Sequence, residues 1–328
     1  MKRALVTGGC GFLGSWMVRR LIDRGVAVRV LAAKGEPRDN VTGLDVDVIE
    51  GDVRSVDVCK RAVSGMDTVF HAAAIYKDWA PDPWPMYDVN LRGTFHVIEA
   101  ARRAGVERVI YTASIVSLGR PKPGALGDET TPYDAWDLDF PYSRSKLHSR
   151  ELAEYFAAWD LDVRVVCPGI VLGPNDIRPT PSGGLILGSL KTPGPAVVFE
   201  GGASYVDVRD AAEAHVLAAE KGHKGERYLA TAHNLTNEEL IRAIDRVTGR
   251  KRPLLRLPVA AARAIAIAME AQAARTGQPL LARDFFEYSL KPSYYSNAKS
   301  VRELGARYRP IEETIGDAVA WFRGRGMV

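Results

Sequence analysis

The chain has 328 residues, of which 46% are hydrophobic and 26% are charged, so it is long enough to bury a sizeable core without disulfides or metals. Its 44 basic residues are scattered among 40 acidic ones, for a formal charge of +4, which argues against a nucleic-acid partner. The three cysteines are too few and too dispersed for a disulfide framework and lack zinc-site spacing. We therefore expect no bound metal and a reducing, cytoplasmic environment.

No segment is expected to enter a membrane. A strand is predicted to begin within three residues of the N-terminus, which leaves no room for a signal peptide. The most apolar later stretch, Val259 to Ala274, carries Arg263 and Glu270 and is predicted to be a packed helix.

The first half of the chain alternates short β-branched runs with amphipathic helical stretches. This alternation is typical of an α/β fold with a doubly wound parallel sheet and helices on both faces. Strands are predicted over Arg3–Thr7, Val26–Leu31, Val46–Glu50, Thr68–His71, Arg108–Thr112 and Asp162–Cys167. Helices are predicted over Phe12–Arg24, Val56–Val63, Met86–Ala104 and Tyr142–Trp159.

The amino-acid composition changes after Pro168, and the segment from Gly169 to Gly202 is rich in Pro and Gly. A strand and helix are predicted around Tyr205 to Lys221, a strand over Gly225–Ala230 and a helix over Asn234–Thr248. The end of the chain is helix-rich. We interpret residues 1–168 plus about 205–232 as a dinucleotide-binding domain, and about 169–204 plus 233–328 as a smaller α/β substrate-binding lobe.

Glycines at regular spacing, Gly8, Gly11 and Gly14, lie where the first predicted strand passes into the first predicted helix, with Phe12 and Leu13 between the last two. A dinucleotide fold binds its pyrophosphate at this position. Gly8 permits a tight turn, Gly11 lets backbone amides approach the phosphates, and Gly14 allows the helix to pack closely on the sheet. The loop therefore predicts a Rossmann fold.

Tyr142 and Lys146 are four residues apart at the start of a predicted helix, so both side chains lie on one face. A free tyrosine titrates near pH 10, and an adjacent ammonium stabilises its phenolate so that it can exchange a proton near neutrality. Ser114 follows the fifth predicted strand, at the sheet edge where doubly wound folds bind ligands. We predict these three residues as the catalytic set.

The chain resembles the extended short-chain dehydrogenases/reductases. The resemblance rests on the G-x-x-G-x-x-G loop and on four further motifs: Gly51-Asp52-Val53, His71-Ala72-Ala73-Ala74, Asn90 within Val-Asn-Leu-Arg-Gly-Thr, and Tyr142-Ser-Arg-Ser-Lys146. It implies that Asp52 binds the adenine amino group, that Ala72, Ala73 and Ala74 form the wall beneath the adenosine, and that Asn90 supports the cofactor.

The same resemblance implies that Thr112 lines the nicotinamide side and that Pro168, Ile170 and Val171 contact the carboxamide. It also implies that Lys146 reaches the nicotinamide ribose. In the resembled family, two long helices form a four-helix dimer interface, so a homodimer is expected.

Within that family the chain is most similar to the dihydroflavonol 4-reductase-like branch, which includes bacterial proteins described as hopanoid-associated sugar epimerases. Val116-Ser-Leu-Gly119 and Ala203-Ser204 depart from the pattern of sugar-nucleotide epimerases, and Ala113-Ser114 departs from that of the dehydratases. We therefore expect reduction of a ketone or aldehyde, or oxidation of the matching alcohol, in a bulky and partly apolar or aromatic small molecule. Predicted substrate contacts are Trp79, Ser114 and Tyr205, although Trp79 suits a loop packed on the second lobe equally well.

The predicted second strand ends in Ala32-Ala33-Lys34 and lacks the carboxylate of NAD-selective sites. We therefore expect NADP(H) to be favoured, with its 2′-phosphate on Lys34 or Arg38, while NAD(H) remains open. Two other functions stay open: a sugar-nucleotide epimerase that retains NAD, and a cofactor-sensing regulator without turnover. The pair Tyr142 and Lys146 argues against the regulator.

Overall fold

A computed structural model describes residues 1–276 and 282–328. Its main sheet has seven parallel strands in the order β10-β6-β5-β4-β1-β2-β3. The predicted doubly wound parallel sheet is confirmed, and the predicted strands agree with the observed ones to within two residues at each end. The strands are β1 (Arg3–Thr7), β2 (Ala27–Ala32), β3 (Val46–Glu50), β4 (Thr68–His71), β5 (Arg108–Thr112), β6 (Asp162–Pro168) and β10 (Arg227–Ala230).

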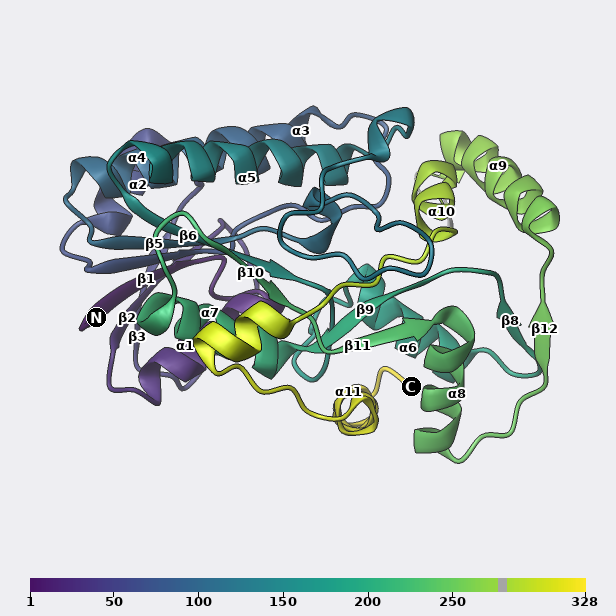
Figure 1. Cartoon of the computed structure of the whole chain (residues 1–328). Coiled ribbons are helices and arrows are strands. Elements are labelled where there is room, and N and C mark those ends of the chain that lie inside the picture. The colour runs from purple at the N-terminus through teal and green to yellow at the C-terminus, as the bar shows by residue number, and fades with distance from the viewer. Residues whose placement is uncertain (277–281) are drawn as a thin grey trace.

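Helices cover both faces of this sheet (Figure 1). One face carries α1 (Phe12–Ile22) and α7 (Val208–Lys221), and the other carries α2 (Val56–Val63), α4 (Thr94–Arg103) and α5 (Pro141–Trp159). The predicted helix Met86–Ala104 consists of three consecutive pieces: α3 (Trp84–Tyr87), the π-helical turn η2 (Asp88–Gly93) and α4. Short helical turns are η1 (Asp39–Val41), η3 (Ile115–Ser117), η4 (Ala135–Asp137) and the π-helical η5 (Ser300–Leu304).

The central strands are apolar on both sides because helices cover both faces. Side chains alternate between the faces along each strand. Leu5 and Val69 pack in the core beneath α2, α4 and α5, whereas Val6 and Phe70 pack in the core beneath α1 and α7. This alternation explains why strands of four to seven residues suffice to hold the sheet.

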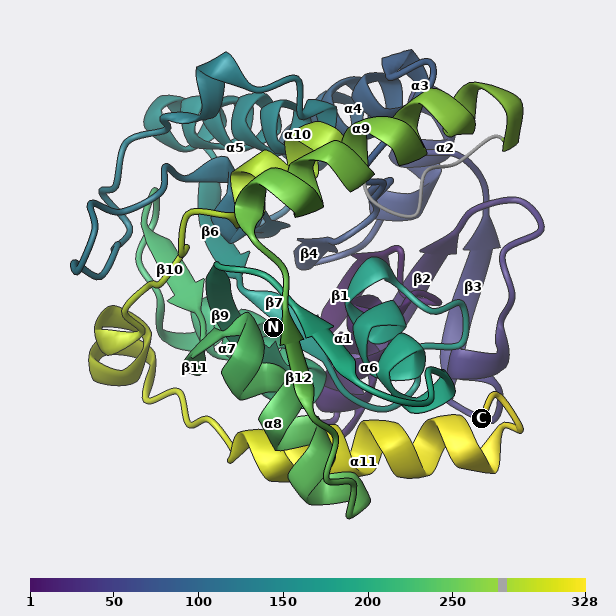
Figure 2. The same ribbon diagram turned by 90° about the vertical axis from the view of Figure 1, so that its right-hand side faces the viewer.

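The smaller lobe is built around two short sheets (Figure 2). The first pairs β7 (Ile170–Leu172), β9 (Gly202–Asp207) and β11 (His233–Thr236), and the second pairs β8 (Ala196–Val198) with β12 (Leu254–Arg256). Within the described ranges, five helices complete it. They are α6 (Pro181–Lys191), α8 (Asn237–Thr248), α9 (Val259–Thr276), α10 (Arg283–Ser289) and α11 (Ile311–Gly324).

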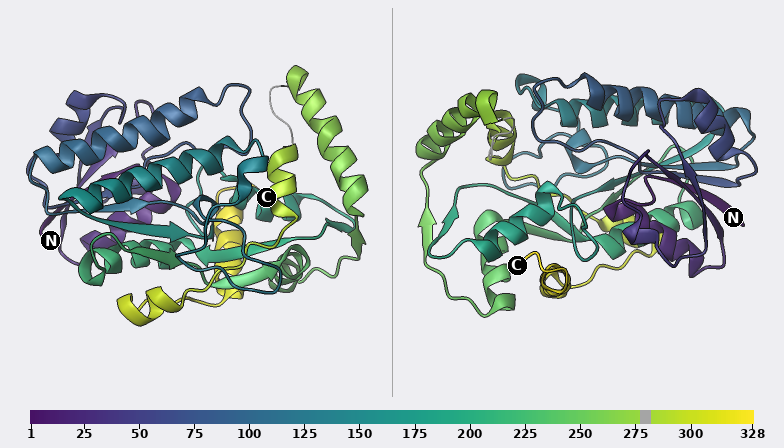
Figure 3. Two further views of the ribbon diagram at one scale, coloured as in Figure 1. Left: turned by 45° about the horizontal axis from the view of Figure 1, so that its top comes forward. Right: turned by 180° about the vertical axis from the view of Figure 1, so that it is seen from behind.

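The two parts exchange chain segments more often than the expected boundaries suggest (Figure 3). Residues Tyr205 to Asp207, expected in the dinucleotide-binding domain, belong to β9 and pair with the lobe's β7 and β11. Conversely, η5, expected in the lobe, packs against α7 and β10 of the main sheet layer. Across the described ranges, no helix combines the length and apolarity that crossing a membrane requires.

Candidate active site

A cavity of about 630 Å³ opens at the carboxyl ends of the central strands. It joins the glycine loop to the predicted catalytic residues, so both predicted halves of the site meet in one space. Ser114 lines it together with most of the predicted cofactor residues: Gly8, Gly11, Phe12, Leu13, Gly14, Lys34, Asp52, Val53, Ala72, Ala73, Ala74, Thr112, Tyr142, Lys146, Pro168, Ile170 and Val171.

The glycine loop leaves no room for side chains. Gly8 has φ +69°, and a Cβ there would lie 2.9 Å from the Ala73 Cα. A Cβ on Gly14 would lie 2.2 Å from the Gly8 carbonyl oxygen, to which the Gly11 N–H also donates at 3.0 Å. The first turn of α1 therefore begins directly behind the loop, with its free amides at the cavity. This cradle fits a dinucleotide pyrophosphate.

Asn90 is buried and supports the cavity wall from behind. Its Oδ1 accepts from the Ile75 N–H at 2.7 Å, and its Nδ2 donates to the Ile75 carbonyl and to the Ser145 Oγ, each at 3.0 Å. It thereby fixes the segment after β4 against α5. Asn90 does not itself line the cavity, and the π-helical turn that carries it directs its amide toward both partners.

Asp52 lines the cavity and is paired with Arg54, a cation that the sequence did not single out. Arg54 Nη2 donates to Asp52 Oδ2 at 2.6 Å, and Arg54 Nη1 reaches Asp88 Oδ2 at 3.2 Å. The hydrogen bonds from Arg54 lower the pKa of the Asp52 carboxyl below its usual value. The carboxylate is therefore ionised and available as an acceptor.

Lys146 is held inside the protein beneath the catalytic end. Pro141 starts α5, so Tyr142 lies in its first turn and Lys146 one turn later on the same face. Lys146 Nζ donates to the Thr112 carbonyl at 2.6 Å and lies 5.0 Å from the centre of the Tyr111 ring. Burial lowers the pKa of Lys146 to about 7.

Burial also raises the pKa of the Tyr142 phenol, while its hydrogen bond with Ser114 acts in the opposite direction. A nearby carboxylate, Asp78, raises this pKa further. The sequence predicted that Lys146 stabilises the phenolate. Here its ammonium is engaged by the Thr112 carbonyl, and the phenol remains protonated at neutral pH, as a proton donor to a carbonyl must be.

An aromatic group surrounds Tyr142. The Tyr76 ring stacks 4.5 Å from the Tyr142 ring, and the Phe140 ring lies at 6.2 Å. Phe285 and Tyr288 come from α10 of the smaller lobe and contact Phe140 at 5.7 and 5.4 Å. The reacting end of the cavity is therefore flanked by rings from both parts of the molecule.

Besides Asn90, three predicted site residues do not line this cavity: Arg38, Trp79 and Tyr205. Arg38 Nη2 donates to Glu50 Oε2 at 2.9 Å. Trp79 is half-buried. Tyr205 is 2% exposed and packs in the core of the smaller lobe, because its position on β9 points it inward.

The cavity also has a lining that sequence reasoning missed: Glu36, Arg54, Tyr76, Val116, Arg178, Thr180 and Ser182. The last three lie in the Pro- and Gly-rich segment after β7, where nothing in the sequence indicated which side chains face inward. Within the described ranges, no cluster of His, Cys, Asp or Glu could hold a metal ion. Cys10, Cys59 and Cys167 are buried free thiols.

Comparisons with known proteins agree with this geometry. Residues 4–230 match the model of the NAD dependent epimerase/dehydratase family. The chain is 33% identical to a putative dihydroflavonol 4-reductase of Synechocystis sp., over 98% of this chain and 95% of that protein. It is also 33% identical to sterol demethylase protein B of Methylococcus capsulatus, over 99% of each.

Solved structures show the same fold. The crystal structure of gox2253 superposes with a TM-score of 0.89 at 34% identity and covers 100% of both chains. UDP-glucose 4-epimerase of Thermus thermophilus, solved with NAD, gives a TM-score of 0.76 at 26% identity over 98% of this chain and 99% of that one. The chain therefore belongs to the NAD dependent epimerase/dehydratase family, a family of NAD(P)-dependent enzymes within the extended short-chain dehydrogenases/reductases.

Proposed function

We propose that this protein reduces the carbonyl group of a bulky, partly apolar or aromatic small molecule, or oxidises the matching alcohol. The observation that carries the proposal is the convergence of Ser114, Tyr142 and Lys146 at one end of a cavity whose other end is the glycine loop. Hydride chemistry would be supplied by a nicotinamide dinucleotide when bound. The protein has to bind the carbonyl, orient it and deliver one proton.

The proton comes from Tyr142. Its hydroxyl donates its proton to the carbonyl oxygen, which becomes the hydroxyl of the alcohol, and solvent returns a proton to the Tyr142 phenolate. The new C–H bond would come from the hydride that the bound dinucleotide supplies. The Ser114 hydroxyl holds the same oxygen. Lys146, which donates to the Thr112 carbonyl, would hold the dinucleotide beside the Tyr142 phenol.

The rings beside Tyr142 support an apolar or aromatic substrate. Tyr76 lines the cavity beside Tyr142, where a flat apolar group gains from stacking, and Phe140 and Phe285 pack behind Tyr142. Relatives named as a dihydroflavonol 4-reductase and as cinnamoyl-CoA reductases, the latter 29% identical in rice, favour a reductase. Trp79 remains a predicted substrate contact, from a loop adjoining Asp78.

Sugar-nucleotide epimerisation is the second candidate, favoured by the likeness to UDP-glucose 4-epimerase. The two differ in net redox chemistry. Purified protein would be incubated with NADH or NADPH and a panel of aromatic ketones, aldehydes, steroids and sugar nucleotides, and absorbance at the reduced-nicotinamide band would be followed. A reductase consumes cofactor with a ketone or aldehyde. Conversion of a sugar nucleotide without net consumption identifies an epimerase and refutes the proposal.

We further propose that the active form is a homodimer joined through α4 and α5. Three large aromatic side chains on these helices are 44 to 64% exposed: Phe95, Tyr155 and Trp159. A patch of this kind suits a protein partner, and the antiparallel packing of two helix pairs buries it. Light scattering of the purified chain should give twice the mass of 35.9 kDa; a monomer at micromolar concentration would refute it.

A further inference from the structure

A tight turn brings a carboxylate back to the end of β2, although the strand itself ends without one. The Glu36 N–H donates to the Ala33 carbonyl at 3.0 Å, and Gly35 closes the turn with φ +71°. The Ala33 N–H in turn donates to Glu36 Oε2 at 3.0 Å. This hydrogen bond fixes the position of the Glu36 carboxylate. The Glu36 side chain is 12% exposed.

That place is beside the glycine loop. A Cβ added to Gly11 would lie 4.0 Å from Glu36 Oε1, and Glu36 lines the same cavity as Gly8 and Gly14. Burial raises the pKa of the Cys10 thiol to about 11, and the nearby negative charge of Glu36 contributes to this rise. In a dinucleotide fold, the space between the glycine loop and the end of the second strand holds the adenosine ribose.

The cations expected to hold a 2′-phosphate are arranged unfavourably for that role. Arg38 is paired with Glu50 and does not line the cavity. Lys34 does line it but is exposed, so solvent and salt screen its charge. Arg178 Nη2 lies 3.8 Å from Glu36 Oε1, and its side chain is 67% exposed. Arg178 is therefore a solvated partner of the Glu36 carboxylate, and the carboxylate keeps its place in the cavity.

We propose that Glu36 selects NAD(H) over NADP(H), by accepting hydrogen bonds from the adenosine ribose hydroxyls and repelling a 2′-phosphate. The carboxylate that β2 lacks is thus supplied by the turn that follows. This reverses the preference for NADP(H) expected from Ala32-Ala33-Lys34. The proposal rests on the dinucleotide site of the proposed function but needs no substrate and no turnover.

The test is direct titration of the protein with NADH and with NADPH by isothermal calorimetry. The parent should bind NADH at least about tenfold more tightly than NADPH. Glu36→Gln keeps the acceptor for the Ala33 N–H but removes the charge, so it should lower this ratio about tenfold, mainly by tightening NADPH binding. Thermal melting of the variant checks that the fold is intact.

Glu312→Gln is the matched control, because it is the same substitution on a carboxylate outside the cavity whose partner is Arg246. It should leave the ratio unchanged. A parent that prefers NADPH, an unchanged ratio in Glu36→Gln, or an equal shift in Glu312→Gln would each overturn the role of Glu36. Failure of the parent to bind either dinucleotide would overturn the dinucleotide site and the proposed function as well.

Discussion

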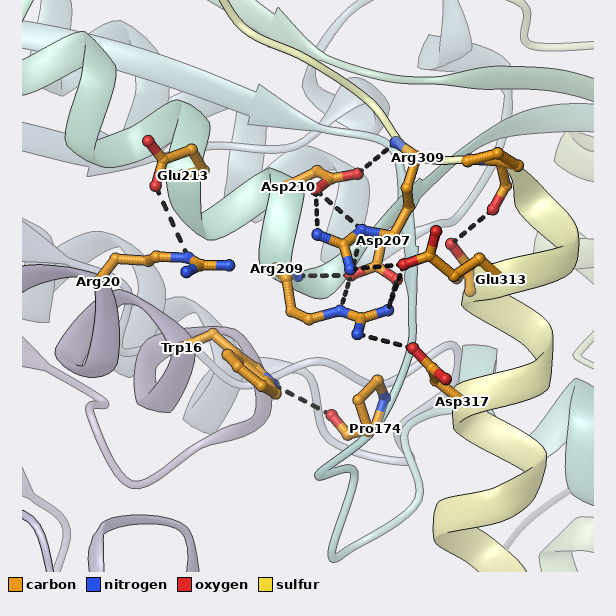
Figure 4. A network of polar contacts seen from close by, with 12 residues as sticks. Trp16, Arg20, Pro174, Asp207, Arg209, Asp210, Glu213, Arg309, Glu313 and Asp317 are labelled. Carbon is orange, nitrogen blue, oxygen red and sulfur yellow. Dashed lines mark hydrogen bonds and ion pairs between the residues drawn. The ribbon is translucent and has the colours of Figure 1, made fainter. Parts of the chain in front are cut away.

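The buried charges at the junction of the two lobes and those around Tyr142, the proposed proton donor, are compensated very differently. At the junction, Asp207 has no exposed side-chain surface and faces two arginines (Figure 4). Arg209 Nη2 lies 2.8 Å from Asp207 Oδ2, and Arg209 Nη1 lies 2.7 Å from Asp317 Oδ2. Arg309 joins the same group through Asp210 at 2.8 Å.

Around Tyr142 the ionisable groups lack such partners. Lys146 is 4% exposed and donates to a neutral carbonyl, and burial lowers its pKa. Asp78 Oδ1 is buried without a hydrogen-bond partner among the described residues, and burial raises the pKa of this carboxyl to about 6. Buried charge is therefore ion-paired at the junction, whereas beside Tyr142 burial shifts the pKa values of Lys146 and Asp78, as is common where protons are transferred.

The largest expected effect is loss of the junction charge. Asp207→Ala leaves Arg209 and Arg309 without their shared buried partner and removes the side-chain oxygen that caps α7 by accepting from the Arg209 N–H at 2.8 Å. We expect the free energy of unfolding to fall by about 3–5 kcal/mol. Guanidinium unfolding followed by tryptophan fluorescence measures it.

The control for this variant is Glu312→Ala, which breaks the pair between Glu312 and Arg246 at 2.8 Å, with both side chains about half exposed. A surface pair of this kind contributes about 0–1 kcal/mol. If the two substitutions lower the free energy of unfolding equally, the junction network contributes no more to stability than a surface ion pair does.

The next largest expected effect is a loss of turnover when the Tyr142 hydroxyl is removed. Tyr142→Phe removes the proton donor and keeps the ring that stacks on Tyr76, so kcat should fall by about a hundredfold or more while dinucleotide affinity and thermal stability change little. Steady-state kinetics on the best substrate of the screen measure it. Tyr133→Phe is the matched control, because its hydroxyl bonds Ser143 at 2.9 Å outside the cavity. Parent-like turnover in Tyr142→Phe would contradict the assignment.

The features that could be predicted from the sequence are those that a local pattern determines. The central strands were predicted because each is a short apolar run bounded by turn residues, and β1, β3, β4 and β5 begin and end as expected. The spacing of Tyr142 and Lys146 placed both on one face of α5 from sequence alone. Local periodicity and the glycine loop carry this information, so no tertiary contact is needed.

The rest of the site depends on contacts between distant segments. Glu36 reaches the end of β2 only because Gly35 closes a turn, and Arg178 reaches Glu36 from a distant part of the sequence. Tyr205 was expected to touch substrate, but the register of β9 between β7 and β11 turns it into the lobe's core. Such side-chain directions are set by pairing partners that a single sequence does not identify.

The smallest expected effect is a gain in stability at the catalytic site. Because the pKa of Lys146 is about 7 in the folded chain and 10.5 in an unfolded one, the unfolded chain binds more protons between these values. The buried ammonium therefore lowers the free energy of unfolding by its full amount below about pH 7, and this loss shrinks as the pH rises toward 10.5. Lys146→Met removes it, together with the bond to the Thr112 carbonyl.

We therefore expect the free energy of unfolding of Lys146→Met to exceed that of the parent by about 1–2 kcal/mol at pH 7, and this difference should shrink toward pH 10. Turnover and dinucleotide affinity should both fall. Denaturant unfolding at pH 7, 8.5 and 10 measures the stability. Lys60→Met on the exposed face of α2 is the control and should show no such pH dependence. A Lys146→Met protein that is less stable than the parent at pH 7 would mean that the buried ammonium is compensated after all, as the charges at the junction are.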